Sequence, residues 1–194
     1  HLIGVGWYDL PLLSFVPHAL GMWIFDKNIL GNRLGSVFFG LATLPIFYLL
    51  LKTFLNKRTA MITTIIFATS NLWLALSRLG IMYIQAAFFL TISIYFLVLG
   101  VKYNKRIFFI LTGISIGMGM YSYYAIRALP LIIFPLVLFY IFHKRGFGNR
   151  ILNLLFMLLI SFIFFLPQIN FFVNNPNTFF SRSNAVFVLS KSGR

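Results

Sequence analysis

Long apolar runs separated by short polar or basic breaks dominate the pattern along the chain. A helix that crosses a bilayer needs about 20 consecutive, mostly apolar residues. Six runs approach that length, so the pattern predicts an all-α fold, a polytopic transmembrane helical bundle of about six spans. The predicted spans are approximately Leu34 to Leu51, Thr59 to Leu76, Tyr83 to Val101, Ile107 to Tyr123, Ala128 to Phe142 and Ile151 to Val173.

The apolar stretch Leu10 to Phe25 is interrupted by Pro11 and Pro17, which makes it a poor spanning helix. We expect it to form an outer juxtamembrane helix that lies in the membrane interface. The predicted organisation is therefore an outer loop and juxtamembrane helix over residues 1–32, a transmembrane bundle over 33–173, and the start of an extracytoplasmic loop over 174–194.

The composition of the chain supports a membrane protein, and it favours lipid headgroups over nucleic acid as the partner of the positive charge. The chain is 60% hydrophobic and 9% charged, whereas soluble domains are about a quarter charged. Sixteen Lys and Arg against two acidic residues give a net charge of +14. These cations lie between apolar runs, which indicates contact with lipid headgroups, so we expect membrane lipids and no nucleic acid as partners. The chain begins at His1 and ends in a polar stretch, and we interpret it as a piece of a longer protein.

The basic residues alternate between clusters and single arginines. Clusters follow the first, third and fifth predicted spans, and the positive-inside rule places them in the cytoplasm. The alternate connections carry one arginine each, which predicts four arginines on the outer face: Arg33, Arg78, Arg127 and Arg182. We therefore expect a multi-pass cell-membrane protein whose active site lies on the extracytoplasmic side.

Arg33, Arg78 and Arg127 are candidate ligands of an anion. Guanidinium groups bind phosphate through two parallel hydrogen bonds and stay charged at physiological pH, so a lipid-linked phosphate is the natural candidate. The alternative is that each arginine reaches to lipid headgroups or caps a helix carbonyl. Arg182 lies in a long polar stretch and is a weaker candidate than the arginines of the short turns.

The sequence YSYYAIR places Tyr121 and Tyr123 close to Arg127, and their aromatic faces and hydroxyls suit a sugar phosphate. An aromatic belt at the membrane interface is an equally good interpretation of these tyrosines. The preceding glycines have the small-xxx-small spacing of close helix packing, and we assign them to structure: Gly113, Gly117 and Gly119.

Asp9 lies two residues before Pro11, where the chain enters the outer interface. A carboxylate there suits a general base or a metal ligand. It also suits the N-cap of a helix that starts at Pro11, and the two roles are compatible. The chain has no cysteine, and its three histidines have no metal-binding spacing, so we predict no metal site while leaving a divalent metal open as a cofactor.

The order of these motifs resembles the GT-C class of membrane glycosyltransferases, specifically family 39, which includes protein mannosyltransferases and aminoarabinose transferases. The resemblance covers most of the chain. It rests on four elements in order: Asp9 and Pro11 in WYDLPLLSF, Gly31 and Arg33 in GNRLGS, Ser77 and Arg78 at a helix hairpin, and Tyr121, Tyr123, Arg127 and Pro130 after a glycine-rich helix.

The resemblance implies transfer of a sugar from a polyprenyl-phosphate donor to a protein, lipid or glycan acceptor on the outer side, by inversion, with a loop carboxylate as base. On this basis Asp9 is the expected catalytic residue, and the expected substrate-binding residues are Arg33, Arg78, Tyr121, Tyr123 and Arg127. Two features depart from the family. Its best-known acidic motif would lie upstream of His1, and Tyr83 stands where many members have aspartate.

A different class of function, a polytopic transporter or a lipid flippase subunit, is the alternative. Such proteins usually place ionisable or helix-breaking residues near the bilayer midplane, often in paired repeats. The six predicted spans contain no acidic residue and show no internal repeat. The sequence therefore favours the glycosyltransferase.

Overall fold

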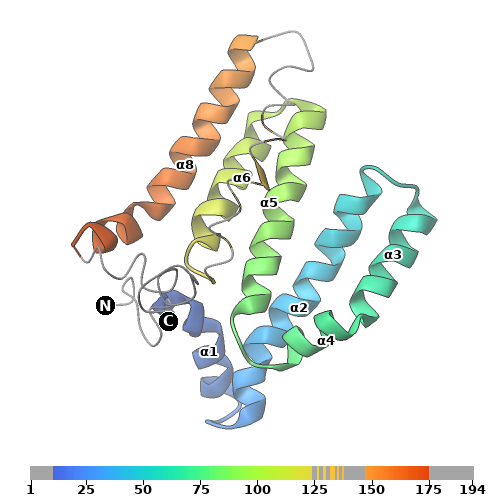
Figure 1. Ribbon diagram of the computed structural model, residues 1–194, viewed down its shortest axis with the longest axis vertical. Coiled ribbons are helices and arrows are strands. Elements are labelled where there is room, and N and C mark those ends of the chain that lie inside the picture. The colour runs from blue at the N-terminus through green and yellow to red at the C-terminus, as the bar shows by residue number, and fades with distance from the viewer. Residues whose placement is uncertain are drawn as a thin grey trace, which may run out of the picture.

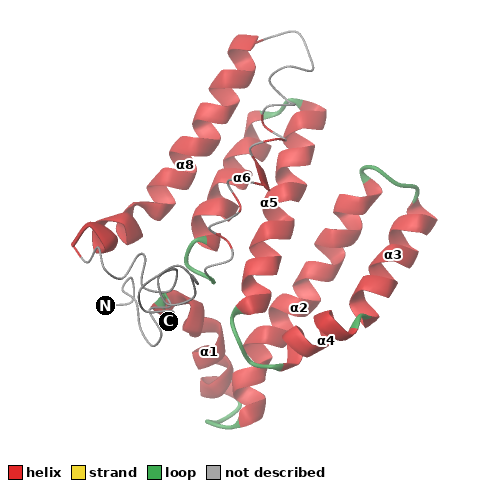
Figure 2. Ribbon diagram, in the orientation of Figure 1, coloured by secondary structure: helices red, strands yellow, loops and turns green. Residues whose placement is uncertain are grey.

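The computed structural model describes residues 11–123, 126, 129, 132–133, 135, 137 and 147–174. The described part of the chain is helical and contains no β-strand element, which confirms the all-α prediction (Figures 1 and 2). Its elements are the short 3-10 helix η2 (Leu12–Phe15) and the helices α1 (Val16–Ile24), α2 (Ile29–Lys52), α3 (Lys57–Thr69), α4 (Asn71–Arg78), α5 (Tyr83–Tyr103), α6 (Arg106–Gly119) and α8 (Phe147–Asn174).

The helices pack side by side, and α2 lies between the α3–α4 pair and α5 (Figure 1). α1, α3 and α4 contact α2, α2 contacts α5, α5 contacts α6, and α6 contacts α8 (Figure 1). A Cβ added to Gly113 would lie 2.5 Å from the Met157 carbonyl oxygen, and one added to Gly117 would lie 3.0 Å from that of Ser161. This matching order shows that α6 and α8 run in the same direction. It also confirms that these glycines serve close helix packing.

The number of spans is lower than the sequence analysis predicts. Among the described residues, three helices are long and apolar enough to cross a membrane, α2, α5 and α8, and a fourth span results if the bent pair α3 and α4 counts as one. The predicted fourth span corresponds to α6, which has only 14 residues. The predicted fifth span, Ala128 to Phe142, lies largely outside the described residues. The prediction of about six spans is therefore corrected to three or four for the described part.

The second predicted span is broken at Ser70, where the axes of α3 and α4 differ by 58°. Ser70 has extended backbone dihedrals and donates through Oγ to the Phe67 carbonyl at 2.7 Å, while Thr69 donates to Ile65 at 2.9 Å. Hydroxyl groups that bond to nearby carbonyls compete with the helical hydrogen bonds. Hydropathy alone does not reveal this competition. The apolar run that was predicted to form one span therefore forms two helices, α3 and α4.

α6 ends at Gly119 rather than at Tyr123. The chain beyond it tightens into a turn, in which the Tyr121 and Ser122 amides donate to Met118 and Gly119 over three residues. α2, in turn, begins at Ile29 rather than Leu34, because the Asn28 side chain accepts the Gly31 amide at 2.8 Å. Arg33 consequently lies within α2 and not before it.

The helix predicted between Leu10 and Phe25 is present as η2 followed by α1. α1 has nine residues, about 13.5 Å at 1.5 Å per residue, and is too short to span. It packs antiparallel on the first turns of α2, because Gly21 faces Gly31 and His18 faces Gly35. Its position in the membrane interface stays a prediction.

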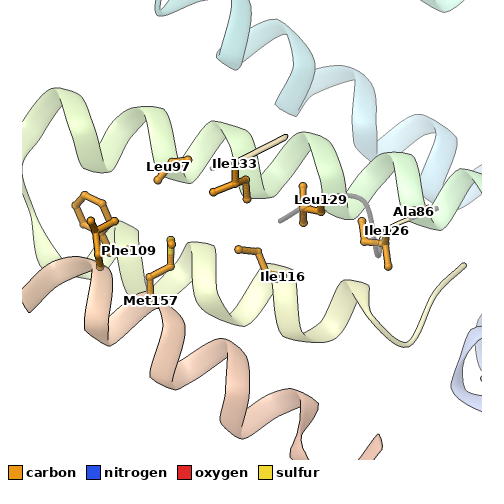
Figure 3. Close-up of a cluster of buried hydrophobic side chains, with 9 residues drawn as sticks. Ala86, Leu97, Phe109, Ile116, Ile126, Leu129, Ile133 and Met157 are labelled. Carbon is orange, nitrogen blue, oxygen red and sulfur yellow. The ribbon is translucent and has the colours of Figure 1, made fainter. Parts of the chain in front are cut away.

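The core lies between α5, α6, α8 and the segment around Ile126, Leu129 and Ile133 (Figure 3). Phe109 is fully buried against Gly100. The other fully buried side chains include small hydroxyl residues that donate to the carbonyl four residues earlier in their own helix, namely Thr43, Ser93 and Thr112. Large apolar side chains point outward from α2, α3 and α8. This arrangement is typical of a bundle whose outer surface faces lipid.

Two ends of the bundle carry different residues (Figure 1). The basic end holds the α2–α3 and α5–α6 connections and the start of α8, with Lys52, Lys57, Arg58, Lys102, Lys105, Arg106 and Arg150. The distal end holds the start of α2, the α4–α5 turn and the end of α6, with Arg33, Arg78, Tyr121 and Tyr123. The predicted separation from the basic clusters is therefore present for Arg33 and Arg78, while Arg127 and Arg182 lie outside the described residues.

Candidate functional site

The α4–α5 turn at the distal end is held in one conformation by α2. Gly80 has a φ of 67°, a left-handed value that glycine adopts without strain. Its carbonyl accepts the Asn32 side-chain amide at 3.4 Å, and the next carbonyl, of Ile81, accepts the Ser36 hydroxyl at 3.0 Å. A Cβ on Gly80 would lie 2.8 Å from Asn32 Nδ2. The dihedral angle therefore favours glycine here, and a larger side chain would in addition displace the Asn32 amide from the Gly80 carbonyl.

Arg33 and Arg78 lie on either side of this turn. Arg78 is the last residue of α4, two residues before Gly80. Arg33 Cγ lies 3.5 Å from the position that a Gly80 Cβ would occupy. Both arginines are exposed, and within the described residues neither makes a hydrogen bond or an ion pair. The fold thus places two candidate arginines, 45 positions apart in the chain, at the same turn. Exposed guanidinium groups there suit an anion.

A cavity of about 420 Å³ lies between α1, α2, α5, α8 and the end of α6. Its polar side chains are Gln85, in the first turn of α5, and Tyr121 and Ser122, just after α6. The rest of its lining is apolar: Val16, Pro17, Phe39, Phe89, Met118 and Phe164. A largely apolar pocket with a few converging polar groups is the usual form of a ligand site.

Tyr121 connects this cavity to α8. Its hydroxyl donates to the Phe164 carbonyl at 3.0 Å, three residues before Pro167, which lies inside α8. Burial raises the pKa of Tyr121, and a hydrogen bond with the Gln168 backbone lowers it to a smaller extent. The hydroxyl therefore stays protonated and keeps donating at physiological pH. Tyr121 both lines the cavity and ties the end of α6 to α8.

We expect Tyr121→Phe to lower the free energy of unfolding by about 1 kcal/mol, the net value of one intramolecular hydrogen bond. Thermal or denaturant unfolding of the purified protein measures this change. Tyr103→Phe is the control, because Tyr103 is exposed at the basic end of the bundle and its hydroxyl forms no hydrogen bond with the residues that the structure describes. Equal stabilities of the two variants would show that the hydrogen bond between Tyr121 and the Phe164 carbonyl does not stabilise the fold.

Tyr83 and Tyr123 meet at the distal end. Their ring centroids are 4.4 Å apart and the rings are inclined at 57°. Tyr83 is the first residue of α5, five residues after Arg78, and 38% of its surface is exposed. Tyr123 is half-buried. Tyr83, which stands where many family members have aspartate, thus packs against Tyr123, one of the predicted substrate-binding residues.

His18 and Gln85 are polar residues of this region that the sequence analysis did not select. His18 is 3% exposed, and its Nδ1 lies 2.8 Å from the Asn32 carbonyl oxygen. Gln85 is also 3% exposed and contacts both His18 and Ser14. The sequence contained a signal for Gln85, since an amide inside the apolar stretch YIQAAFF requires buried partners.

Asp9 and Arg127 lie outside the described residues, so the structure does not test their predicted positions. Pro11 and Ser14, which follow Asp9, are described and buried. No group of three or more His, Cys, Asp or Glu side chains that could hold a metal ion occurs among the described residues. The remaining acidic residue, Asp26, is exposed in the turn between α1 and α2.

Comparison with known proteins identifies the family to which this sequence is similar. The sequence profile of the dolichyl-phosphate-mannose-protein mannosyltransferase family matches residues 9–171. The chain is 26% identical, over 145 residues, to the undecaprenyl phosphate-alpha-4-amino-4-deoxy-L-arabinose arabinosyl transferase of Serratia proteamaculans, and 22% identical, over 125 residues, to the protein of the same name from Erwinia tasmaniensis. These alignments cover 71% and 62% of this chain but only 26% and 23% of the relatives. The chain thus spans about a quarter of their length. No solved structure matches.

Proposed function

Since this chain belongs to the dolichyl-phosphate-mannose-protein mannosyltransferase family, we propose that it forms part of a membrane glycosyltransferase that uses a polyprenyl-phosphate-linked sugar as donor. The names of the family and of both relatives contain a polyprenyl phosphate, dolichyl or undecaprenyl. The acceptor is a protein, lipid or glycan. Transfer takes place at the distal end of the bundle, on the extracytoplasmic side of the cell membrane.

The observation that supports this proposal is the presence of Arg33 and Arg78 at the same α4–α5 turn, at the end of the bundle where Tyr121 lines the 420 Å³ cavity. A phosphodiester at a membrane surface needs donors that remain charged in an environment of low dielectric constant, and guanidinium groups meet that need. Neither arginine is neutralised by a carboxylate within the described residues. Lipid snorkelling alone does not require a turn locked by Asn32 and Ser36 between the two arginines.

The remaining roles complete the proposed site. Arg127 supplies a third guanidinium group that binds the donor phosphate. Tyr121 and Tyr123 contact the sugar. Asp9 removes the proton from the acceptor hydroxyl, whose oxygen attacks the anomeric carbon as the bond to the lipid phosphate breaks, with inversion. The polyprenyl phosphate departs as an anion, and the arginines stabilise its charge.

We expect Arg78→Gln in the full-length protein to raise the KM for the polyprenyl-phosphate sugar donor about ten-fold. Hydrogen bonds to charged groups contribute about 1.5–3 kcal/mol, and 1.4 kcal/mol is a factor of ten. Steady-state sugar transfer at varied donor concentration measures this KM. Arg58→Gln is the matched control, an exposed arginine on α3 at the basic end. A donor KM that Arg78→Gln leaves at the wild-type value would contradict the proposed phosphate contact.

A further inference from the structure

Gln168 in α8 carries a buried polar atom that the fold leaves unpaired. It lies in the apolar stretch FLPQINFF, and only 1% of its surface is exposed. Its side-chain carbonyl oxygen, Oε1, is buried and has no hydrogen-bond partner among the residues that the structure describes. A buried amide oxygen without a partner costs free energy, and most such atoms in native proteins are paired. Gln168 thus differs from the buried Gln85, whose amide donates to the Ser14 carbonyl.

The packing of α6 against α8 places Gln168 beside the 420 Å³ cavity. The side of α6 that faces α8 recurs every four residues: Gly117 packs on Phe164, and Tyr121 donates to the Phe164 carbonyl at 3.0 Å. The Tyr121 oxygen also interacts with the Gln168 backbone. Gln168 is one helical turn beyond Phe164 and therefore lies on the same side of α8. Tyr121 and Phe164 both line the cavity, so Gln168 adjoins it where α6 has already ended.

The protein's own donors around the cavity are already used. Its polar side chains donate to backbone carbonyls: Tyr121 to Phe164 at 3.0 Å, Ser122 to Gly119 at 2.6 Å and Gln85 to Ser14 at 2.8 Å. Tyrosine and serine each have a single hydroxyl hydrogen, so neither of these residues has a second one to donate. The hydrogen that Gln168 Oε1 needs must therefore come from a bound molecule.

The chemistry of this atom selects one part of the proposed donor. An amide oxygen only accepts hydrogen bonds, so its ligand must carry an O–H or N–H group. A phosphodiester and a polyprenyl chain have neither, whereas a sugar has several hydroxyls. We propose that Gln168 is a substrate-binding residue whose Oε1 accepts a hydrogen bond from a hydroxyl of the donor sugar. This inference rests on the proposed function, in which the neighbouring Tyr121 contacts that sugar.

Gln168→Met separates a ligand-binding role from a structural one through the stability of the ligand-free protein. Methionine has a similar length and removes the unpaired oxygen, so we expect the melting temperature of the full-length protein to stay equal or rise. Gln85→Met is the matched control, because the same substitution there leaves the buried Ser14 carbonyl without its donor and should lower the melting temperature. A lower melting temperature for Gln168→Met, or its failure to fold, would overturn the inference.

Binding of lipids to the full-length protein in detergent tests the ligand. The probes are undecaprenyl phosphate alone and undecaprenyl phosphate that carries mannose, glucose or 4-amino-4-deoxy-L-arabinose. For the sugar lipid that the wild type binds most tightly, we expect Gln168→Met to raise the Kd about ten-fold, the effect of one buried hydrogen bond. The Kd for undecaprenyl phosphate alone should change less than two-fold, because this lipid lacks the sugar. Arg78→Gln should weaken the binding of both lipids.

The outcomes distinguish the inference from the proposed function. An unchanged Kd of Gln168→Met for the sugar lipid would overturn the inference alone, provided that Arg78→Gln weakens binding. An equal loss for both lipids would also overturn it, since the sugar would then play no part. A wild-type protein that binds none of the four lipids would contradict the proposed function, and the inference would fail with it.

Discussion

Asp9→Asn is expected to lower kcat for sugar transfer by about 10³-fold while the donor KM stays near its wild-type value. Asparagine has the same size and can still cap a helix, but it cannot accept the proton of the acceptor hydroxyl. General base catalysis contributes typically 10²- to 10⁴-fold. The measurement is the initial rate of sugar transfer from a polyprenyl-phosphate donor by the full-length protein in membranes or detergent.

The chain itself supplies the control for this variant. Asp26 is the only other acidic residue of the 194, and it is exposed in the turn between α1 and α2. Its φ of 68° is one that asparagine also adopts, so Asp26→Asn leaves the turn intact. We expect wild-type kcat for Asp26→Asn. Equal activity of Asp9→Asn and the wild type would show that Asp9 is not the base.

Gly21→Leu is expected to separate α1 from α2 and to lower kcat about a hundred-fold. A Cβ at position 21 would lie 2.2 Å from the Gly31 carbonyl oxygen, which is a backbone atom and cannot rotate away. α1 would have to move, and the hydrogen bonds that His18 and Gln85 form across this contact would break. Overpacking costs about 1–3 kcal/mol of folding stability. A shift of about 1 Å in the groups of a reacting site can lower the rate about a hundred-fold.

Ala19→Leu separates this effect from a general response to a larger side chain. Ala19 is on the same helix but is exposed, so the same leucine is accommodated there without a clash. Thermal unfolding and sugar transfer are measured for both variants. We expect Gly21→Leu alone to lose both stability and activity. Retained activity in Gly21→Leu would mean that the contact between α1 and α2 is not needed for the reaction.

The sequence predicts the candidate site in part. Arg33, Arg78, Tyr121 and Tyr123 all lie at the distal end, because residues at alternate connections of successive spans must share one side of a bundle. His18 and Gln85 could not be paired in advance, since 67 positions separate them and only the packing of α1 against α2 and α5 brings them together. The same holds for Tyr83 and Tyr123, whose stacking depends on how α5 and α6 meet.

The sequence by itself determined that this protein is a helical membrane bundle with basic clusters at one end. Backbone groups in a bilayer must be paired within a helix, and charged side chains must leave the apolar region, so hydropathy and charge suffice for that conclusion. The tertiary structure decided where helices break and which polar groups meet. The bend at Ser70, the early end of α6 and the hydrogen bonds of Gln85 depend on hydroxyl and glycine contacts between neighbouring turns and helices, and no one-dimensional pattern of hydropathy specifies these.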